Sequence, residues 1–429
     1  MNAHLLPTGT RIEPFLDPIG ESPVANHPLE WWQRRACEAC GLVLQTPEVP
    51  VRGPCVVLAD DLFVTRGLLR AFLDALGTDP PREPRVLRVE GSAQLAQAAP
   101  LQGLTVVAAG PDRASASFPL WYLPPGWEGL PSAVDEIPPV AVTPREKLLR
   151  IPVPEHYFGS PELLVPLSMQ VVMRLRHWTH LLQVNRVAWA LEWLDRPGWR
   201  QALTLAWAVI RAGIPTRTRL LRTLSRVGRG CEIHPTAVLE GAILEDGVRV
   251  GPFCVVRFSR VGRASWLQDH AQVTLSVLGE RTMVSASSTV NLCLTWPEAA
   301  ASQILMQLSV LGRRSITTGG GFMMDMRFDR NVRVLHEGRA QDSGTRFLGS
   351  AVGHGAILGT GFWLAPGRAI PNGAVVVRPP DQVVREIPRE VADGTLLAPV
   401  QGRLVPLEGG GTASDPRAVV AGTDAGEGV

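Results

Sequence analysis

Lysine is almost absent from this chain of 429 residues, because Lys147 is the only one among its 42 Lys and Arg residues. Arginine stays protonated and cannot serve as a tunable amine, so chemistry that needs several lysines is excluded. The formal net charge is only +2, which gives no argument for binding nucleic acid. The composition therefore predicts neither lysine-based catalysis nor a nucleic-acid partner.

Long apolar runs are also missing. No run reaches about 18 residues, so no transmembrane helix is predicted. The N-terminus lacks a basic stretch followed by an apolar core, so no secretory signal is predicted. The six cysteines are scattered, which fits buried thiols in a reducing cytoplasm. Cys37 and Cys40 form one C-x-x-C inside a helical-looking run, where a packed helix face is favoured over zinc or redox chemistry.

The second half of the chain is periodic. From Ile233 it reads IHPTAV, LEGAI, LEDGVR, VGPFCV, VRFSR, VGRASW, LQDHAQ, VTLSV, and the pattern returns later as VGHGAI, LGTGFW, LAPGRA, IPNGAV. Equivalent aliphatic residues recur every 17 positions, as at Leu244, Val261 and Leu278. Neither a helical period nor simple alternation gives this spacing. We therefore predict a left-handed parallel β-helix (hexapeptide repeat) over residues 227–380, with these three side chains stacked inside a triangular prism.

Residues 312–354 carry strings that are more specific than the repeat: DMRFD at 325–329 and DSGTRFLG at 342–349. The segment resembles the bifunctional sugar-1-phosphate nucleotidyltransferase/acetyltransferase family (GlmU-like enzymes), and archaeal-type members look closer. The resemblance implies a homotrimer with sites between neighbouring prisms, acyl-CoA such as acetyl-CoA as donor, and a sugar phosphate or nucleotide sugar as ligand. The residues that the resemblance places near such a cleft are Asp325, Arg327, Asp342 and Arg346. The guanidinium groups of the two arginines are suited to bind a phosphate through paired hydrogen bonds. An equally common role for such arginines is a salt bridge at the surface.

The segment also departs from the family. The acetyl-transfer histidine of the family falls here near Ser302, and no histidine is nearby. Two other histidines are alternative catalytic candidates: His270, which follows Asp269, and His354, although a solvent-facing corner is the favoured reading of each. The β-helix histidines form no cluster of three in the sequence, so no zinc site is predicted.

The first half resembles the opening of a sugar nucleotidyltransferase in LLPTGTRIEPFLDPIGESPVANHPLEWWQRRACEACG. We therefore expect a shortened, Rossmann-like α/β domain over residues 1–160. Gly9, Thr10 and Arg11 match the end of the family's glycine-rich phosphate loop, whose backbone N–H groups approach a triphosphate. Pro7 stands where the loop needs an N–H, and the family's phosphate-binding lysine is missing around residues 18–19.

The segment CVVLADDLFVTRGLLRAFLDAL predicts a buried strand, a turn at Asp60 and Asp61, and an amphipathic helix. In the family a metal-binding aspartate stands where Asp61 does, which implies Mg²⁺, but either aspartate would equally cap the helix. Only about ten residues separate the end of the CEACG helix from this strand, so the segment that recognises the base looks deleted. Working nucleotidyl transfer is therefore not expected.

Residues 161–226 predict a tryptophan-rich helical connector, in which packing against the first domain is favoured over lying on an anionic membrane. A C-terminal segment over 381–403 and a disordered tail over 404–429 complete the organisation.

Three functions stay open. The first is a transferase of sugar nucleotides or sugar phosphates in cell-envelope polysaccharide or amino-sugar metabolism. The second is a non-catalytic binding or scaffold protein descended from it. The third is a membrane-surface protein held by the tryptophan-rich helices. A cytoplasmic location is expected, with peripheral contact to the inner face of the membrane left open.

Overall fold

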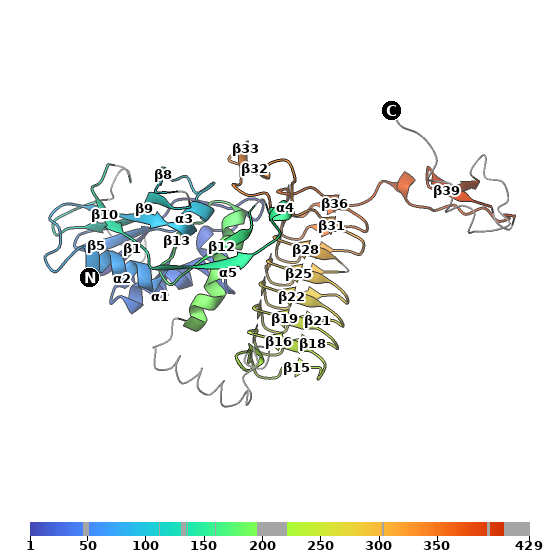
Figure 1. Ribbon diagram of the computed structural model, residues 1–429, viewed down its shortest axis with the longest axis horizontal. Helices are drawn as coiled ribbons and strands as arrows, with labels where there is room; N and C mark the ends of the chain where they lie inside the picture. The colour runs from blue at the N-terminus through green and yellow to red at the C-terminus, as the bar shows by residue number, and fades with distance from the viewer. Residues whose placement is uncertain are drawn as a thin grey trace.

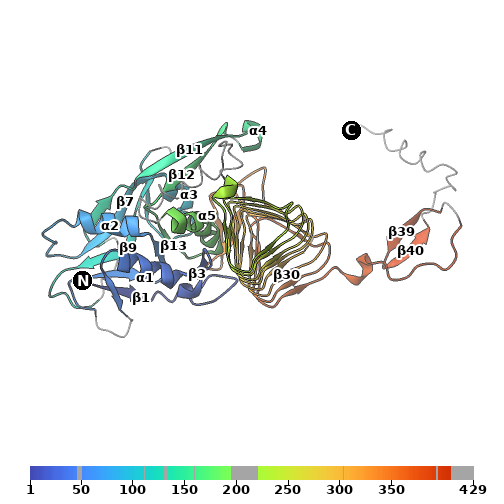
Figure 2. The same ribbon diagram turned by 90° about the horizontal axis from the view of Figure 1, so that it is seen from below.

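In the computed structural model an α/β region and a prism of short parallel strands lie side by side, and a C-terminal arm extends away from both (Figures 1 and 2). The structure describes residues 1–45, 51–110, 112–129, 134, 136–158, 160–194, 221–302, 304–392 and 395–406.

The N-terminal region is built on a mixed sheet with the order β10-β7-β9-β5-β1-β4, and β8 pairs with β9. The strands of this sheet are β1 (Asn2–Leu6), β4 (Val43–Gln45), β5 (Cys55–Ala59), β7 (Arg85–Ser92), β8 (Val106–Ala108), β9 (Ala114–Leu123) and β10 (Pro139–Val142). Strands β4, β1 and β5 are parallel, whereas β9 is antiparallel to both β5 and β7. Helices that share one buried core with the sheet are α1 (Leu29–Ala39), α2 (Arg66–Ala75) and α3 (Ala93–Ala98). The predicted α/β character and the strand at 55–59 are confirmed.

Shorter elements connect this sheet to the prism. They are η1 (Ile19–Glu21), β2 (Pro23–Val24), β3 (His27–Pro28), β6 (Leu62–Val64), β11 (Glu146–Pro152), α4 (Glu155–Phe158), β12 (Glu162–Ser168), β13 (Val172–Arg174) and α5 (Trp178–Leu194). The prediction of helices from residue 161 was wrong as far as residue 177, because α5 begins at Trp178. Pro166 cannot continue a helix, and β12 pairs instead with β11 as an antiparallel hairpin. Among the described residues, no helix combines the length and apolar character needed to cross a membrane.

The prism consists of three parallel sheets, so the expected stacking is confirmed. Leu244 pairs with Val261, which pairs with Leu278, and all three side chains are buried. Sheet 1 contains β14 (Arg226–Val227), β17 (Ile243–Leu244), β20 (Arg260–Val261), β23 (Val277–Leu278), β26 (Leu294–Thr295), β29 (Val310–Leu311), β34 (Ala351–Val352) and β37 (Ala369–Ile370). Sheet 2 contains β15 (Glu232–Ile233), β18 (Arg249–Val250), β21 (Trp266–Leu267), β24 (Met283–Val284), β27 (Ala300–Ala301), β30 (Ile316–Thr317), β35 (Ile357–Leu358) and β38 (Val375–Val376). Sheet 3 contains β16 (Val238–Glu240), β19 (Val255–Arg257), β22 (Gln272–Thr274), β25 (Thr289–Asn291), β28 (Leu305–Gln307), β31 (Phe322–Met323) and β36 (Trp363–Leu364).

Small polar residues hold one corner of the prism together. Ser259 Oγ accepts the backbone N–H of Ser276 at 3.1 Å, and Ser276 Oγ accepts that of Cys293 at 3.0 Å. Each hydroxyl therefore satisfies a backbone donor of the next coil, which an aliphatic side chain cannot do. At another corner Gly279 is required by close approach, because a Cβ there would lie 2.5 Å from the backbone carbon of Trp296.

The prism is interrupted once, between β31 and β34. Residues 324–350 leave the coil and form the hairpin β32 (Arg333–His336) and β33 (Arg339–Asp342). On the same side, α5 packs against β23 and β26 of sheet 1, and one hydrophobic core contains residues of both regions. Buried Trp178 and partly buried Trp189 belong to this core, which confirms packing for that part of the connector. Trp199 and Trp207 lie outside the described residues.

The C-terminal arm follows β38 and contains η2 (Pro380–Gln382), β39 (Leu397–Val400) and β40 (Arg403–Pro406). The predicted disordered tail was wrong for residues 404–406, which pair in β40, and the rest of it lies outside the described residues.

Candidate functional site

The loop after β1 meets the end of β5, as the resemblance to a nucleotidyltransferase implies. The carboxyl ends of neighbouring parallel strands share one edge of a sheet, where ligands usually bind. Here Thr8 donates both its backbone N–H and its hydroxyl to Asp60 Oδ1, at 3.0 and 2.6 Å. The backbone N–H of Thr10 donates to Thr8 Oγ1 at 3.3 Å. The backbone donors of Thr8 and Thr10 are therefore already bonded within the protein.

The remaining residues of this loop do not form a binding site for an anion. Gly9 has φ +68°, the left-handed conformation that glycine adopts without strain. Arg11 Nη1 donates to the carbonyl oxygen of Leu16 at 2.5 Å. Burial raises the pKa of Asp60, and the two hydrogen bonds from Thr8 oppose that rise. A carboxylate thus occupies the place next to these donors, where it repels an incoming phosphate.

Asp61 is paired with a guanidinium. Its side chain is fully buried, and Arg174 of β13 donates from Nη2 to Oδ2 at 2.7 Å and from Nε to Oδ1 at 3.3 Å. The resemblance implies a metal ion at this carboxylate. Among the described residues there is no group of three or more His, Cys, Asp or Glu side chains placed to hold one. The Asp61 charge is instead compensated by Arg174, as a buried carboxylate requires.

The sugar- and phosphate-binding candidates lie in the excursion at residues 324–350. Arg327 and Arg346 are adjacent across a short antiparallel bridge, since the Arg327 N–H donates to the Arg346 carbonyl oxygen at 3.0 Å. The Arg327 guanidinium binds Asp329 through two hydrogen bonds, at 3.0 and 3.1 Å. Arg346 is exposed, and no contact of its guanidinium occurs among the described residues. The guanidinium of Arg346 is therefore available to a ligand.

The two aspartates of the excursion have different surroundings. Asp342 accepts the N–H of Gly344 at 2.7 Å and a donor from Asn331 at 3.3 Å, so it shapes the turn. Burial raises the pKa of Asp325, whose carbonyl oxygen accepts the N–H of Leu348. Neither carboxylate lies in an ion pair with Arg327 or Arg346 among the described contacts. Both therefore contribute to the fold of the excursion as well as to its charge.

His354 joins the prism to the N-terminal region. Its Nδ1 accepts the backbone N–H of Arg313 at 2.7 Å, and its Nε2 donates to Asp17 Oδ2 at 2.5 Å. Phe15 and Trp296 stand against the ring at 5.2 and 4.7 Å. Burial lowers the pKa of His354, while Asp17 opposes that shift. Both ring nitrogens are in use, so in this arrangement neither is available to a substrate.

His270 is the more accessible of the two histidine candidates. It stands at the corner between sheets 2 and 3, with φ +61°, and its ring stacks on Phe253 at 5.1 Å. Its side chain is exposed, and among the described residues its ring has no hydrogen-bond partner. The imidazole therefore faces solvent beside an aromatic ring, with Asp269 preceding it in the chain.

Three histidines from two segments meet at the junction of the two regions, and sequence reasoning missed them. The ring of His177 lies 6.4 Å from that of His180 and 5.3 Å from that of His336 on the hairpin. Burial, the largest cause, lowers the pKa of His177 to about 2 and that of His180 to about 4. Both rings are thus neutral, and the only sequence signal was the H-W-T-H spacing.

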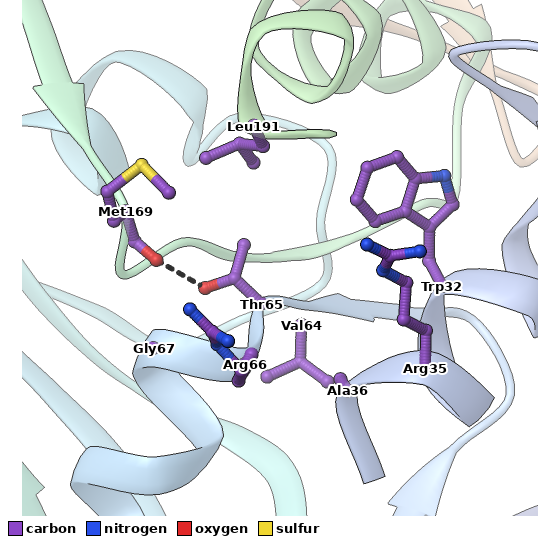
Figure 3. A pocket seen from close by; sticks show the side chains of 9 residues that line it. All are labelled: Trp32, Arg35, Ala36, Val64, Thr65, Arg66, Gly67, Met169 and Leu191. Carbon is purple, nitrogen blue, oxygen red and sulfur yellow. Dashed lines mark hydrogen bonds between the residues drawn. The ribbon is translucent and has the colours of Figure 1, made fainter. Parts of the chain in front are cut away.

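Two hollows can be described, and one of them lies beside a histidine of this group. One of about 500 Å³ lies beside His336, between the α3–β8 connection and the hairpin, where Arg176 binds Glu337 at 3.0 Å. The other holds only about 20 Å³, room for about one water molecule. Figure 3 shows Thr65 within it, donating its hydroxyl to the Met169 carbonyl oxygen at 2.9 Å. The second hollow is therefore too small for a sugar or a nucleotide.

A scan against protein-family models and a search of curated proteins found no match to this chain. Function must therefore be argued from the geometry. The structure brings Thr8, Thr10, Asp60 and Asp61 together, and separately Arg327 and Arg346. It joins His354 to Asp17, and His270 stands apart from all of these.

Proposed function

We propose that this protein is a non-catalytic binding or scaffold protein that descends from a sugar-nucleotide transferase. The observation that carries the proposal is the buried pair of Asp61 with Arg174. Nucleotidyl transfer depends on cations that neutralise the phosphates, and here the carboxylate expected to hold a metal is already neutralised. The loop donors bonded to Asp60 support the same conclusion.

The proposed ligand is a sugar phosphate or a nucleotide sugar, held at the excursion. Arg346 supplies an uncommitted guanidinium, and Arg327 lies next to it. A guanidinium binds phosphate oxygens through paired hydrogen bonds, which gives both affinity and orientation. The phosphate is therefore the part of the ligand that this site would recognise.

The proposal includes a homotrimer of left-handed prisms. The N-terminal region covers sheet 1, whereas sheets 2 and 3 carry exposed large apolar side chains: Trp266, Leu305, Ile316, Phe322, Ile357, Trp363 and Val375. Exposed apolar surface of this kind marks an interaction site. Association of three copies along these faces would remove it from water.

A second function, acyl transfer at the prism, is favoured by one observation. His270 stands on the corner between the two open sheets, with its imidazole accessible. An accessible imidazole at a subunit boundary can accept a proton from an attacking hydroxyl or amine. The membrane-surface alternative has less support, because Trp178 and Trp189 are occupied in the core.

The test combines a binding and an activity measurement. The full chain is titrated with a hexose 1-phosphate and a nucleoside-diphosphate sugar while thermal unfolding is followed, since a ligand of the native state raises the midpoint. We expect Arg346→Ala to weaken the response about tenfold or more, the value of one charge-assisted contact, and Arg330→Ala to leave it unchanged. Acyl transfer from acetyl-CoA, or pyrophosphate release from a nucleoside triphosphate, would overturn the non-catalytic proposal.

A further inference from the structure

The C-terminal arm, residues 377–406, leaves the prism at the end of sheet 2 and extends away from the rest of the molecule (Figures 1 and 2). It carries many large apolar side chains that are exposed: Val377, Val383, Val384, Ile387, Val391, Leu396 and Val400. The Ile387 side chain is 72% exposed. A segment this apolar gains stability only when another surface covers it.

The described contacts of the arm hold it to itself. Glu386 binds Arg403 at 2.7 Å, and the N–H groups of Arg385 and Leu404 close the same small unit at 2.8 and 3.0 Å. At the root, Arg378 donates to the carbonyl oxygen of Gly361. Beyond that root, no described hydrogen bond or ion pair joins the arm to the prism. A two-stranded hairpin alone is only marginally stable in water.

A complementary apolar surface exists on the open faces of the prism, near the coils from which the arm departs. Trp363 of sheet 3 is 71% exposed, and its ring meets that of Phe322 at 6.3 Å. Ile357 and Val375 are exposed on the adjoining sheet 2. Sheet 1 offers less apolar surface to an arm, because the N-terminal region covers its strands from β23 to β34.

We propose that the arm of one copy lies on the exposed apolar side chains of the last coils of sheets 2 and 3 of a second copy of this chain, around Ile357, Trp363 and Val375. The direction of the arm favours a second copy, because it points away from its own prism (Figure 2). In a closed symmetric ring every arm is received, and the apolar side chains of the last coils are covered in every copy. The inference rests on the homotrimer of the proposed function and is independent of its ligand and chemistry.

The test compares three variants of the full chain. Ile387→Asp places a charge on the apolar side of the arm, and Trp363→Asp places one on the receiving face. Gln382→Asp is the matched control, since it introduces the same acid at an exposed polar position of the arm. Mass is measured by light scattering over a dilution series, and thermal unfolding is followed at two protein concentrations.

We expect Ile387→Asp and Trp363→Asp each to raise the dissociation concentration at least tenfold, while Gln382→Asp matches the parent. Dissociation that is changed by Trp363→Asp but not by Ile387→Asp would overturn arm exchange and leave the homotrimer intact. A midpoint that Ile387→Asp lowers equally at both concentrations, with unchanged mass, would show that the arm covers its own chain and would also overturn it. Failure of the ligand titration leaves these readouts unaffected, so the two proposals fail separately.

Discussion

Arg174 and Asp61 form a pair whose two members come from segments more than 100 residues apart. The Asp61 side chain has no exposed surface, and Arg174 is only 14% exposed. Removing two charges from water is costly, and their attraction and hydrogen bonds only offset that cost. The main contribution of the pair is therefore to the position of β13 on β6. Its net contribution to the free energy of unfolding is small.

The first prediction concerns the loss of one partner. Arg174→Ala leaves a buried carboxylate without a counter-charge, and we expect it to lower the free energy of unfolding by about 3–5 kcal/mol. Arg330→Ala is the control, because Arg330 pairs with Asp329 at the surface at 3.4 Å and should cost less than about 1 kcal/mol. Urea denaturation of both variants gives the comparison. Equal losses in the two would mean that Asp61 does not depend on Arg174.

The elements of the prism depend on how closely neighbouring coils approach at their corners. Gly279 lies against the backbone of Trp296 and Pro297, which belong to the next coil. Its backbone does not adopt a positive φ, so the requirement for glycine comes from space alone. A methyl group there has no room unless two coils separate.

The second prediction follows from this contact. Gly279→Ala would place its Cβ 2.5 Å from the Trp296 backbone carbon, and we expect a loss of about 1–3 kcal/mol in unfolding free energy, the cost of overpacking. Gly20→Ala is the matched control, since its nearest neighbour would be Glu30 Cβ at 3.8 Å. Denaturation curves of the two variants should separate clearly, and overlapping curves would contradict the close approach.

The prism was predictable because each coil repeats the contacts of the coil before it. A period of 17 residues in the sequence is therefore enough to predict the stacked coils. The strand at 55–59 was predictable from its continuous apolar run. The β11–β12 hairpin was not predictable, because its apolar residues also suit a helix. Only the presence of a pairing strand decides between helix and strand there. Site partners were not predictable either. Nothing near Asp61 in the sequence points to Arg174, and nothing near His354 points to Asp17.

At the scale of the whole molecule, a buried imidazole whose contacts depend on protonation stands beside the junction of the two regions. His180 is buried, with its Nε2 on the carbonyl oxygen of Pro100 at 2.9 Å, and the N–H groups of Arg176 and His177 on its Nδ1. Arg174, Arg176 and His336 also face it, and all disfavour an additional positive charge. A proton on this ring would break its acceptor contacts and remain buried without a counter-charge.

The third prediction is that acid weakens the packing around His180. The pKa of His180 is lowered to about 4 in the folded protein, against roughly 6.5 in an unfolded chain, so the unfolded state binds the proton more readily. Stability from this group is therefore complete above about pH 6.5 and falls as the pH drops towards 4, by about 1.4 kcal/mol per pH unit. Urea denaturation at pH 7.5, 6.0 and 5.0 measures the slope. His180→Gln should lower the slope by about 1.4 kcal/mol per pH unit and leave the part that comes from His177, whose pKa is also lowered. His156→Gln, on the exposed helix α4, should leave the slope unchanged, and equal slopes in both variants would place the acid sensitivity elsewhere.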